Sequence, residues 1–255
     1  MSLIYVLSVF LFNLLASNQQ DELGFDLSET TNIADTTSVR YLMGKFDASK
    51  HVDFERISLK YCNREDLFLR KEALHAYFEM EKTARKAGVK LVIISATRNF
   101  QQQKRIWEKK WSKLLSDEQS GKVGKRIAEE KAKEILKFSS MPGSSRHHWG
   151  TDIDLNSLTD DYFRKGEGEK VYRWLILNAA RFGFCQPYTS KKNGRTGYEE
   201  EKWHWTYVPL SKEFTLAARN KLKDNMFDGF LGSEVAPNLR IVNHYMLGVS
   251  EACSK

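Results

Sequence analysis

Two short segments of the chain concentrate side chains that can bind a metal ion. The first, residues 144–156, contains two adjacent histidines, a lone glycine and two aspartates one residue apart, and the second is residues 201–205. Neutral imidazole and carboxylate ligands without a nearby thiolate suit zinc, and a catalytic zinc typically takes three protein ligands and leaves one position for water. The segments therefore predict a zinc site with the candidate ligands His147, His204 and either Asp152 or Asp154.

The order of side chains in both segments is typical of β-strands. Alternation over residues 151–156 predicts a strand that carries both aspartates on one face. The same pattern over residues 203–208 predicts a second strand, and an antiparallel neighbour of the first could supply His204. Because Asp152 and Asp154 share a face, spacing leaves open which one binds the metal and which one supports a ligand.

Glu201 is a candidate general base. It precedes His204 by three positions, which on a regular strand would direct it to the opposite face. A turn or bulge before the strand would bring its carboxylate to the metal, where it could accept a proton from water.

Arg98 is a candidate for binding a substrate carboxylate. It follows the apolar segment 89–95, whose β-branched residues predict a buried central strand. The planar guanidinium matches a carboxylate in bidentate fashion. The alternative interpretation is a surface arginine that caps the following helix.

Hydrophobic periodicity predicts the helices that support these segments. The first ends at Gly88, where a C-terminal cap belongs, and the second begins with Asn99 as its N-cap. Helices and strands do not alternate regularly, so we expect an α+β fold with a mostly antiparallel central sheet flanked by helices. The expected helices cover residues 65–87, the residues after Asn99, two charged stretches within 108–137 that join near Gly121 and Gly124, residues 170–182 and residues 212–223.

Composition indicates a globular protein with a basic surface. The chain has 255 residues, of which 41% are apolar, and its 40 Lys and Arg against 33 Asp and Glu give a net charge of +7. Such a charge suits a nucleic acid, an anionic membrane surface or an anionic cell-wall polymer. Basic residues alternate with glutamates and no nucleic-acid-binding signature occurs, so no nucleic acid partner is expected. The cysteines, Cys62, Cys185 and Cys253, form no C-x-x-C pair and allow one disulfide with one free thiol.

The N-terminal segment predicts export. Residues 3–16 form an apolar run of the length found in secretory signals and short for a membrane span. An uncleaved anchor or an apolar N-terminal helix is the alternative. Residues 18–39 are polar and acidic without sustained periodicity, which is typical of a linker.

Three motifs together resemble one family of zinc peptidases. Ser145-x-His147-x-x-Gly150-x-x-x-Asp154 followed by Glu201-x-x-His204 is similar to the zinc signature of D-alanyl-D-alanine carboxypeptidases and dipeptidases of vancomycin resistance and cell-wall trimming. The wider superfamily includes lysostaphin-type endopeptidases and the hedgehog amino-terminal domain. Ser95-Ala96-Thr97-Arg98 resembles the family's second block, and Pro142-Gly143-x-Ser145 resembles its approach to the first ligand. The resemblance covers roughly residues 89–208, in the family's order.

This resemblance implies a hedgehog/D,D-peptidase-like fold with one zinc ion per chain, and it favours Asp154 over Asp152 as the ligand. Asp152 and Thr97 stand where the family commonly has a small and an aromatic residue, so we expect the charge and shape of the pocket to differ there. His148, next to a ligand, could orient substrate, but it is expected to contact the ligands from outside the pocket or to be exposed. The implied site comprises the zinc ligands His147, Asp154 and His204, the catalytic base Glu201, and the substrate-binding residues Arg98 and Ser145.

The implied activity is a zinc-dependent D-alanyl-D-alanine carboxypeptidase that hydrolyses peptidoglycan stem peptides. An endopeptidase that cuts between L-alanine and D-glutamate of the stem is the alternative in the same class. A non-catalytic zinc-binding module of the same fold is the alternative from another class, although it would have no need of Glu201.

The apolar N-terminal run, the polar segment after it and the extent of the resemblance together set the expected organisation of the chain. We expect a signal peptide over residues 1–17, a linker over 18–39, a zinc peptidase domain over 40–225 and a C-terminal extension over 226–255. After signal removal no stable membrane insertion is expected. The expected location is the periplasm or the cell envelope, and the sequence indicates no oligomeric state.

Overall fold

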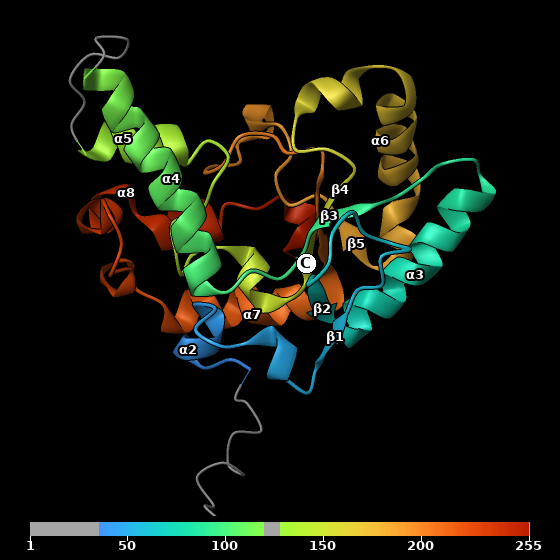
Figure 1. Ribbon diagram of the computed structural model, residues 1–255, viewed down its shortest axis with the longest axis horizontal. Coiled ribbons are helices and arrows are strands. Elements are labelled where there is room, and N and C mark those ends of the chain that lie inside the picture. Colours follow the sequence, from blue (N-terminus) through green and yellow to red (C-terminus); the bar gives the residue numbers. More distant parts are fainter. Residues whose placement is uncertain (1–35, 120–127, 255) are drawn as a thin grey trace, which may run out of the picture. The chain divides into compact units, whose positions relative to one another are not determined.

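The computed structural model describes residues 36–119 and 128–254 (Figure 1). The expected signal peptide, most of the expected linker and the glycine-containing join at 120–127 lie outside the described residues. Within the described ranges, none of the helices combines the length and apolarity that a bilayer span requires. All the described residues belong to one unit, Ala34–Lys255.

A four-stranded antiparallel sheet forms the centre of this unit. Its strand order is β3 (Ile93–Ser95), β4 (Asp152–Leu155), β6 (His204–Tyr207) and β5 (Phe184–Cys185). A separate antiparallel pair consists of β1 (Phe54–Arg56) and β2 (Phe68–Arg70). The expected α+β architecture with a mostly antiparallel sheet is therefore confirmed.

Strand β3 lies at the edge of the sheet, so the expectation of a central strand was wrong. Its apolar sequence has a different cause, because the segment before β2 covers its free edge. Ile93 donates its backbone N–H to the Tyr61 carbonyl at 2.9 Å, and Asn63 donates to the Ile93 carbonyl at 3.2 Å. An edge strand that is covered in this way is buried like a central one.

Helices α3 (Lys71–Lys86) and α6 (Gly166–Asn178) cover the apolar face of the sheet (Figure 1). Ile153 and Leu155 of β4 point into this core and are completely buried. Helix α3 begins later than expected because residues 68–70 pair with β1. The side chains that the two helices contribute to this core include Leu74, Tyr77, Met80, Val171 and Leu175.

A second apolar core lies among the remaining helices and the C-terminal residues. Asn99 caps α4 as expected: its Oδ1 accepts from the Gln102 N–H at 2.9 Å, and the Gln102 side chain accepts from the Asn99 N–H at 2.8 Å. Residues after α7 contribute to this core, and Phe227, Ile241 and Met246 are all buried. The helices are α2 (Val39–Leu42), α4 (Phe100–Gln119), α5 (Ala128–Ile135), α7 (Val208–Lys221) and α8 (Ala236–Leu239).

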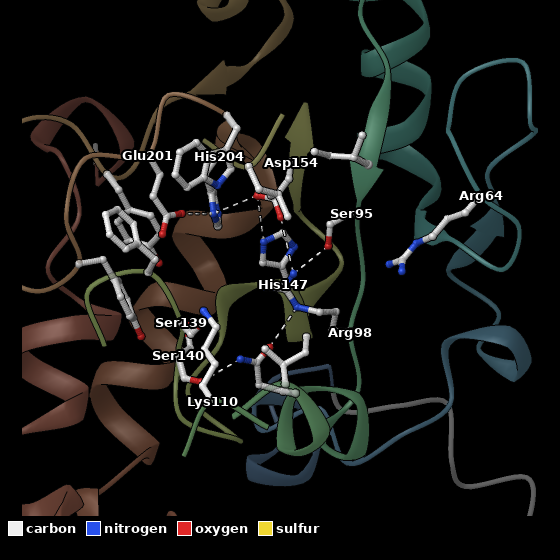
Figure 2. Close-up of a pocket in the computed structure, with 18 residues that line it drawn as sticks. Arg64, Ser95, Arg98, Lys110, Ser139, Ser140, His147, Asp154, Glu201 and His204 are labelled. Atoms are coloured by element: carbon white, nitrogen blue, oxygen red, sulfur yellow. Dashed lines mark hydrogen bonds and ion pairs between the residues drawn. The ribbon is translucent and has the colours of Figure 1, made fainter. Parts of the chain in front are cut away.

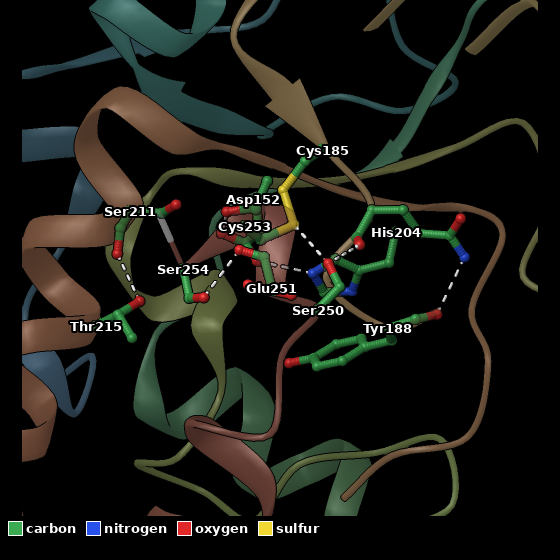
Figure 3. Close-up of a disulfide and its surroundings, with 12 residues drawn as sticks. Asp152, Cys185, Tyr188, His204, Ser211, Thr215, Ser250, Glu251, Cys253 and Ser254 are labelled. Carbon is green, nitrogen blue, oxygen red and sulfur yellow. Dashed lines mark hydrogen bonds and ion pairs between the residues drawn. A yellow bond between two sulfur atoms is a disulfide. The ribbon is translucent and has the colours of Figure 1, made fainter. Parts of the chain in front are cut away.

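A disulfide fastens the C-terminal residues to the sheet (Figure 3). Cys185 of β5 is bonded to Cys253, with a Cα–Cα separation of 5.8 Å. Beside it, Ser250 donates from its Oγ to the Gln186 carbonyl at 2.8 Å. The remaining cysteine, Cys62, is buried and has a free thiol.

Candidate active site

Pairing of the strands brings three polar side chains into one row. Ser95 of β3 is paired with Asp154 of β4, which is paired with His204 of β6. Side chains at directly paired positions lie on the same face of a sheet, here the face opposite the α3 and α6 core. Asp152 and Thr206 form the next pair along the same face.

His147 reaches this row from a short helical turn, Arg146–Trp149. Gly150 ends the turn in the left-handed region with φ 73°, and a Cβ there would lie 2.3 Å from the Phe54 ring. His147 Nδ1 lies 2.8 Å from the Ala96 carbonyl oxygen, which can only accept, so Nδ1 carries the proton. Its Nε2 is thereby left to face Asp154 Oδ1, at 3.4 Å.

His204 faces Asp154 with its Nδ1, whereas His147 faces Asp154 with its Nε2. Its Nδ1 lies 3.4 Å from Asp154 Oδ1 and 3.1 Å from Glu201 Oε2, whereas its Nε2 lies 2.8 Å from Asp152 Oδ2. Figure 2 shows the side chains of His147, Asp154, His204 and Glu201 directed toward one another. Each imidazole therefore turns one nitrogen toward Asp154 and holds the other in a hydrogen bond.

The donor atoms of His147, Asp154 and His204 fit a zinc ion. They lie within 4.8 Å of one another, and Asp154 Oδ1 is 3.4 Å from a nitrogen of each histidine. Ligands at zinc–nitrogen and zinc–oxygen bond lengths in a tetrahedron are about 3.3 Å apart. His147 Nε2 and Asp154 Oδ1 are buried and lack a hydrogen-bond partner in the described part of the chain. A buried polar atom of this kind costs about 1–3 kcal/mol unless something satisfies it, and a cation would do so.

Glu201 lies in a turn before β6, as the hypothesis of a general base at this position requires. His204 donates its N–H to the Glu201 carbonyl at 3.3 Å, and β6 begins only at His204. The Glu201 backbone is held on both sides, because its N–H donates to the Tyr188 carbonyl at 2.9 Å and its carbonyl accepts from Gln186 Nε2 at 3.1 Å. This turn brings the Glu201 carboxylate to the same side of the strand as the His204 imidazole.

The ionisable groups of the site shift one another's pKa. Burial raises the pKa of Glu201 and outweighs its hydrogen bond to His204. Burial disfavours the charged form of His204, but hydrogen bonds to Asp152 and Glu201 outweigh it and raise its pKa to about 9. Burial likewise opposes ionisation of Asp154, yet the neighbouring His147 and His204 lower its pKa to about 2.

A cavity of about 360 Å³ is lined by the three candidate ligands, by Glu201 and by Arg98. The Arg98 guanidinium is held in place at two nitrogens: Nη1 donates to Ser95 Oγ at 2.7 Å and Nε donates to Gln103 Oε1 at 3.0 Å. Nη1 also lies 3.6 Å from Asp154 Oδ2. Arg98 therefore lines the cavity and is not a surface residue that caps α4.

Four of the residues that the sequence singled out do not line this cavity: Ser145, Thr97, His148 and Asp152. Ser145 is completely buried, and its Oγ has no hydrogen-bond partner among the described residues. Thr97 lines a different cavity, next to Phe68. His148 is completely buried, and its Nδ1 donates to the Arg98 carbonyl at 2.6 Å. Thr97 and Asp152 were expected to alter the charge and shape of the pocket, but neither side chain lines this cavity.

The residues on the cavity wall that sequence reasoning missed include Arg64, Lys110 and Tyr188. Lys110 shares a face of α4 with Gln103 and Ile106, which also line the cavity, and this helical spacing is the signal that could have revealed it. Tyr188 lies in an irregular segment, and its ring centroid is 4.8 Å from that of His204. Arg64 precedes β2 in a segment without periodicity.

Comparisons with known proteins agree with the motifs. A family model described as VanY, D-alanyl-D-alanine carboxypeptidase, matches residues 66–210. A D-alanyl-D-alanine carboxypeptidase of Enterococcus faecalis is 33% identical over 127 residues, which cover 50% of this chain and 43% of the relative. One of Enterococcus faecium is 27% identical over 164 residues, covering 64% of this chain and 45% of the relative. The chain thus spans less than half the length of either relative.

One solved structure with a similar fold is the LdcB LD-carboxypeptidase, whose structure was described as revealing the basis of peptidoglycan recognition. The two chains share 25% sequence identity and superpose with a TM-score of 0.50 over 70% of this chain and 77% of the other. The likeness covers the mixed helix and antiparallel sheet arrangement.

Proposed function

The chain belongs to the VanY family of D-alanyl-D-alanine carboxypeptidases, and we propose that it is a zinc-dependent carboxypeptidase that releases the terminal D-alanine from peptidoglycan stem peptides. The observation that carries this proposal is the buried group of His147, Asp154 and His204, whose donor atoms lie at zinc-ligand spacing. The Glu201 carboxylate lies 3.1 Å from one of these ligands. The proposed site comprises Glu201 as the base, Arg98 as the substrate anchor and His147, Asp154 and His204 as the ligands of one zinc ion.

Glu201 would move the proton during hydrolysis. A bound zinc ion supplies Lewis-acid chemistry, which activates water and polarises the peptide carbonyl. The Glu201 carboxylate accepts a proton from water and transfers it to the amine of the leaving D-alanine. Burial raises the pKa of Glu201, so it holds that proton more readily than an exposed glutamate would.

Arg98 would orient the substrate. Ser95 and Gln103 fix two of its guanidinium nitrogens, so the group is positioned before substrate arrives. A carboxypeptidase must recognise the terminal carboxylate of its substrate, and a held guanidinium can bind it through two hydrogen bonds. With Arg64 and Lys110 on the same wall, the cavity suits an anionic peptide.

The test is digestion of a synthetic stem pentapeptide that ends in D-alanyl-D-alanine, followed by mass analysis. Loss of one alanine in the absence of chelator, and no reaction in its presence, is expected. Cleavage between L-alanine and D-glutamate would instead identify the endopeptidase. A stem tetrapeptide belongs in the same experiment, because the LdcB relative is an LD-carboxypeptidase.

A variant separates catalysis from metal binding. Glu201→Gln is expected to keep bound zinc but to lose at least about 100-fold in kcat, the usual contribution of a general base. Glu200→Gln is the matched control, because Glu200 does not line the cavity and should retain activity. Full activity in Glu201→Gln would rule out the proposed base. A parent chain that binds zinc but hydrolyses none of the peptides would favour a non-catalytic zinc module.

The proposed substrate lies outside the cytoplasm, so we propose that the protein acts in the periplasm or at the cell envelope. The disulfide between Cys185 and Cys253 supports this location, because such bonds persist in oxidising compartments. Fractionation of cells that produce the full chain, with the disulfide state of each fraction measured by thiol alkylation, would test the proposal. A cytoplasmic protein in which Cys185 and Cys253 are alkylated would contradict it, whereas alkylation of Cys62 is expected in either case.

A further inference from the structure

Asp152 has a hydrogen-bond environment that the proposed reaction does not use. Its carboxylate is completely buried and does not line the cavity. Oδ2 accepts from His204 Nε2 at 2.8 Å and from Arg146 Nε at 3.2 Å. Oδ1 accepts from Thr206 Oγ1 at 2.6 Å and from Thr151 Oγ1 at 2.7 Å. Both oxygens are therefore occupied by donors that come from β6, from the turn Arg146–Trp149 and from Thr151, which directly precedes β4.

Arg146 provides the positive charge that balances this carboxylate. Its guanidinium is also buried, and it donates through Nη1 to Thr215 Oγ1 at 2.9 Å and through Nη2 to Thr206 Oγ1 at 3.1 Å. It lies 4.6 Å from the Trp149 ring. A buried pair with this many hydrogen bonds keeps Asp152 ionised and its position fixed.

An ionised carboxylate can only accept hydrogen bonds, so the Asp152 contact determines where His204 carries its proton. Nε2 must be the donor, which leaves the lone pair of the neutral imidazole on Nδ1. Nδ1 is the nitrogen that faces Asp154 Oδ1. The hydrogen bond thus selects the tautomer and the ring orientation that a metal ion at the His147, Asp154 and His204 site would need.

We propose that Asp152, with Arg146 as its counter-ion, is a positioning residue that directs His204 Nδ1 toward the metal. This inference rests on the proposed zinc site, and it assigns to Asp152 the role of holding one of the zinc ligands in place. Asp152 stands where the family commonly has a small residue. In this chain its charge would orient His204 and strengthen it as a metal ligand.

The first test is the zinc affinity of the purified full-length chain, measured by competition with a chromogenic chelator. Asp152→Asn preserves shape but removes the charge that holds the imidazole proton, and a loss of about 10–100-fold in affinity is expected. Thr215→Val is the matched control, because it removes one hydrogen bond from Arg146 without touching Asp152. It should bind zinc within about threefold of the parent, since its effect is confined to the support of Arg146.

A merely structural role for Asp152 would lower thermal stability without changing metal coordination. The second readout therefore uses cobalt in place of zinc. The visible absorption bands of the cobalt form report the ligand geometry, and they are expected to change in Asp152→Asn but not in Thr215→Val. Circular dichroism verifies that both variants fold.

A third measurement needs no variant. Nitrogen-15 NMR of the histidine side chains in the zinc-loaded parent is expected to show His204 protonated at Nε2 and metal-bound at Nδ1. Metal binding through Nε2, or parental zinc affinity in a folded Asp152→Asn, would overturn the inference while leaving the proposed peptidase function intact. A parent that binds no zinc would overturn both.

Discussion

Asp154 and His204 occupy paired positions on the adjacent strands β4 and β6, and Asp154 Oδ1 lies 3.4 Å from His204 Nδ1. The register of one strand pair therefore sets the distance between two candidate ligands. His147 completes the group from the turn that leads into β4, so strain or slippage in this pair would affect all three donors.

Zinc is expected to stabilise the folded chain. Binding to the folded state alone adds about 2.7 kcal/mol to the free energy of unfolding when free zinc is 100 times its Kd. Differential scanning calorimetry with and without zinc measures the rise in Tm. Asp154→Asn should abolish most of that rise, whereas Asp161→Asn, at an exposed side chain, should leave it unchanged. An equal rise in both variants would refute the assignment of Asp154 as a ligand.

Replacement of Arg98 by lysine is expected to raise KM more than it lowers kcat. The lysine keeps the charge but loses the planar fork and the bonds to Ser95 and Gln103, which corresponds to about a 10–100-fold loss in kcat/KM. The measurement compares a stem peptide with its carboxy-terminal amide. The parent should prefer the free carboxylate and Arg98→Lys should prefer it less; Arg105→Lys, on the exposed surface of α4, is the control. A parent that cleaves both substrates equally would contradict the anchor role.

The stability of the metal-free protein is expected to fall as pH rises from 6.5 to 9. In the folded state the pKa of His204 is raised from 6.5 to about 9, because hydrogen bonds to Asp152 and Glu201 outweigh burial. Between these values the folded state retains a proton that the unfolded state releases, so this contribution is complete below pH 6.5 and lost by about pH 9. The difference amounts to about 3 kcal/mol. Urea unfolding in the presence of chelator measures it, and His204→Asn should show a clearly smaller decline. A flat profile in the parent would argue against the charged network.

Loss of the disulfide is expected to destabilise the chain and to loosen the segment that carries Glu201. The double variant Cys185→Ser with Cys253→Ser should lose about 2–4 kcal/mol in the free energy of unfolding. Ser250 next to the disulfide contacts the Gln186 carbonyl, and Gln186 holds the Glu201 carbonyl, so kcat should fall more than KM rises. Reductant should destabilise the parent by a similar amount and leave the double variant unchanged. Cys62→Ala, which retains the disulfide, should respond to reductant as the parent does.

Local sequence patterns predicted the chemistry of the site and much of the local structure. The types and order of His147, Glu201 and His204 indicated a metal-dependent hydrolase, and strand alternation placed both aspartates on one face. Asn99 begins α4 as its N-cap, and Gly88, with φ 72°, follows the end of α3, both as expected. The strand alternation and the helix ends depend on residues that are close in the chain, which is why the pattern alone could predict them.

The way in which distant residues meet depends on how the chain packs. Spacing left Asp152 and Asp154 equivalent as candidate ligands. In the structure Asp154 faces one nitrogen of each histidine, whereas Asp152 contacts the other nitrogen of His204. The covered edge of β3, the burial of Ser145 and the bond from Cys185 to Cys253 likewise depend on contacts between segments far apart in sequence. Strand register and burial are properties of the packed chain, and no local pattern encodes which partner a side chain will face.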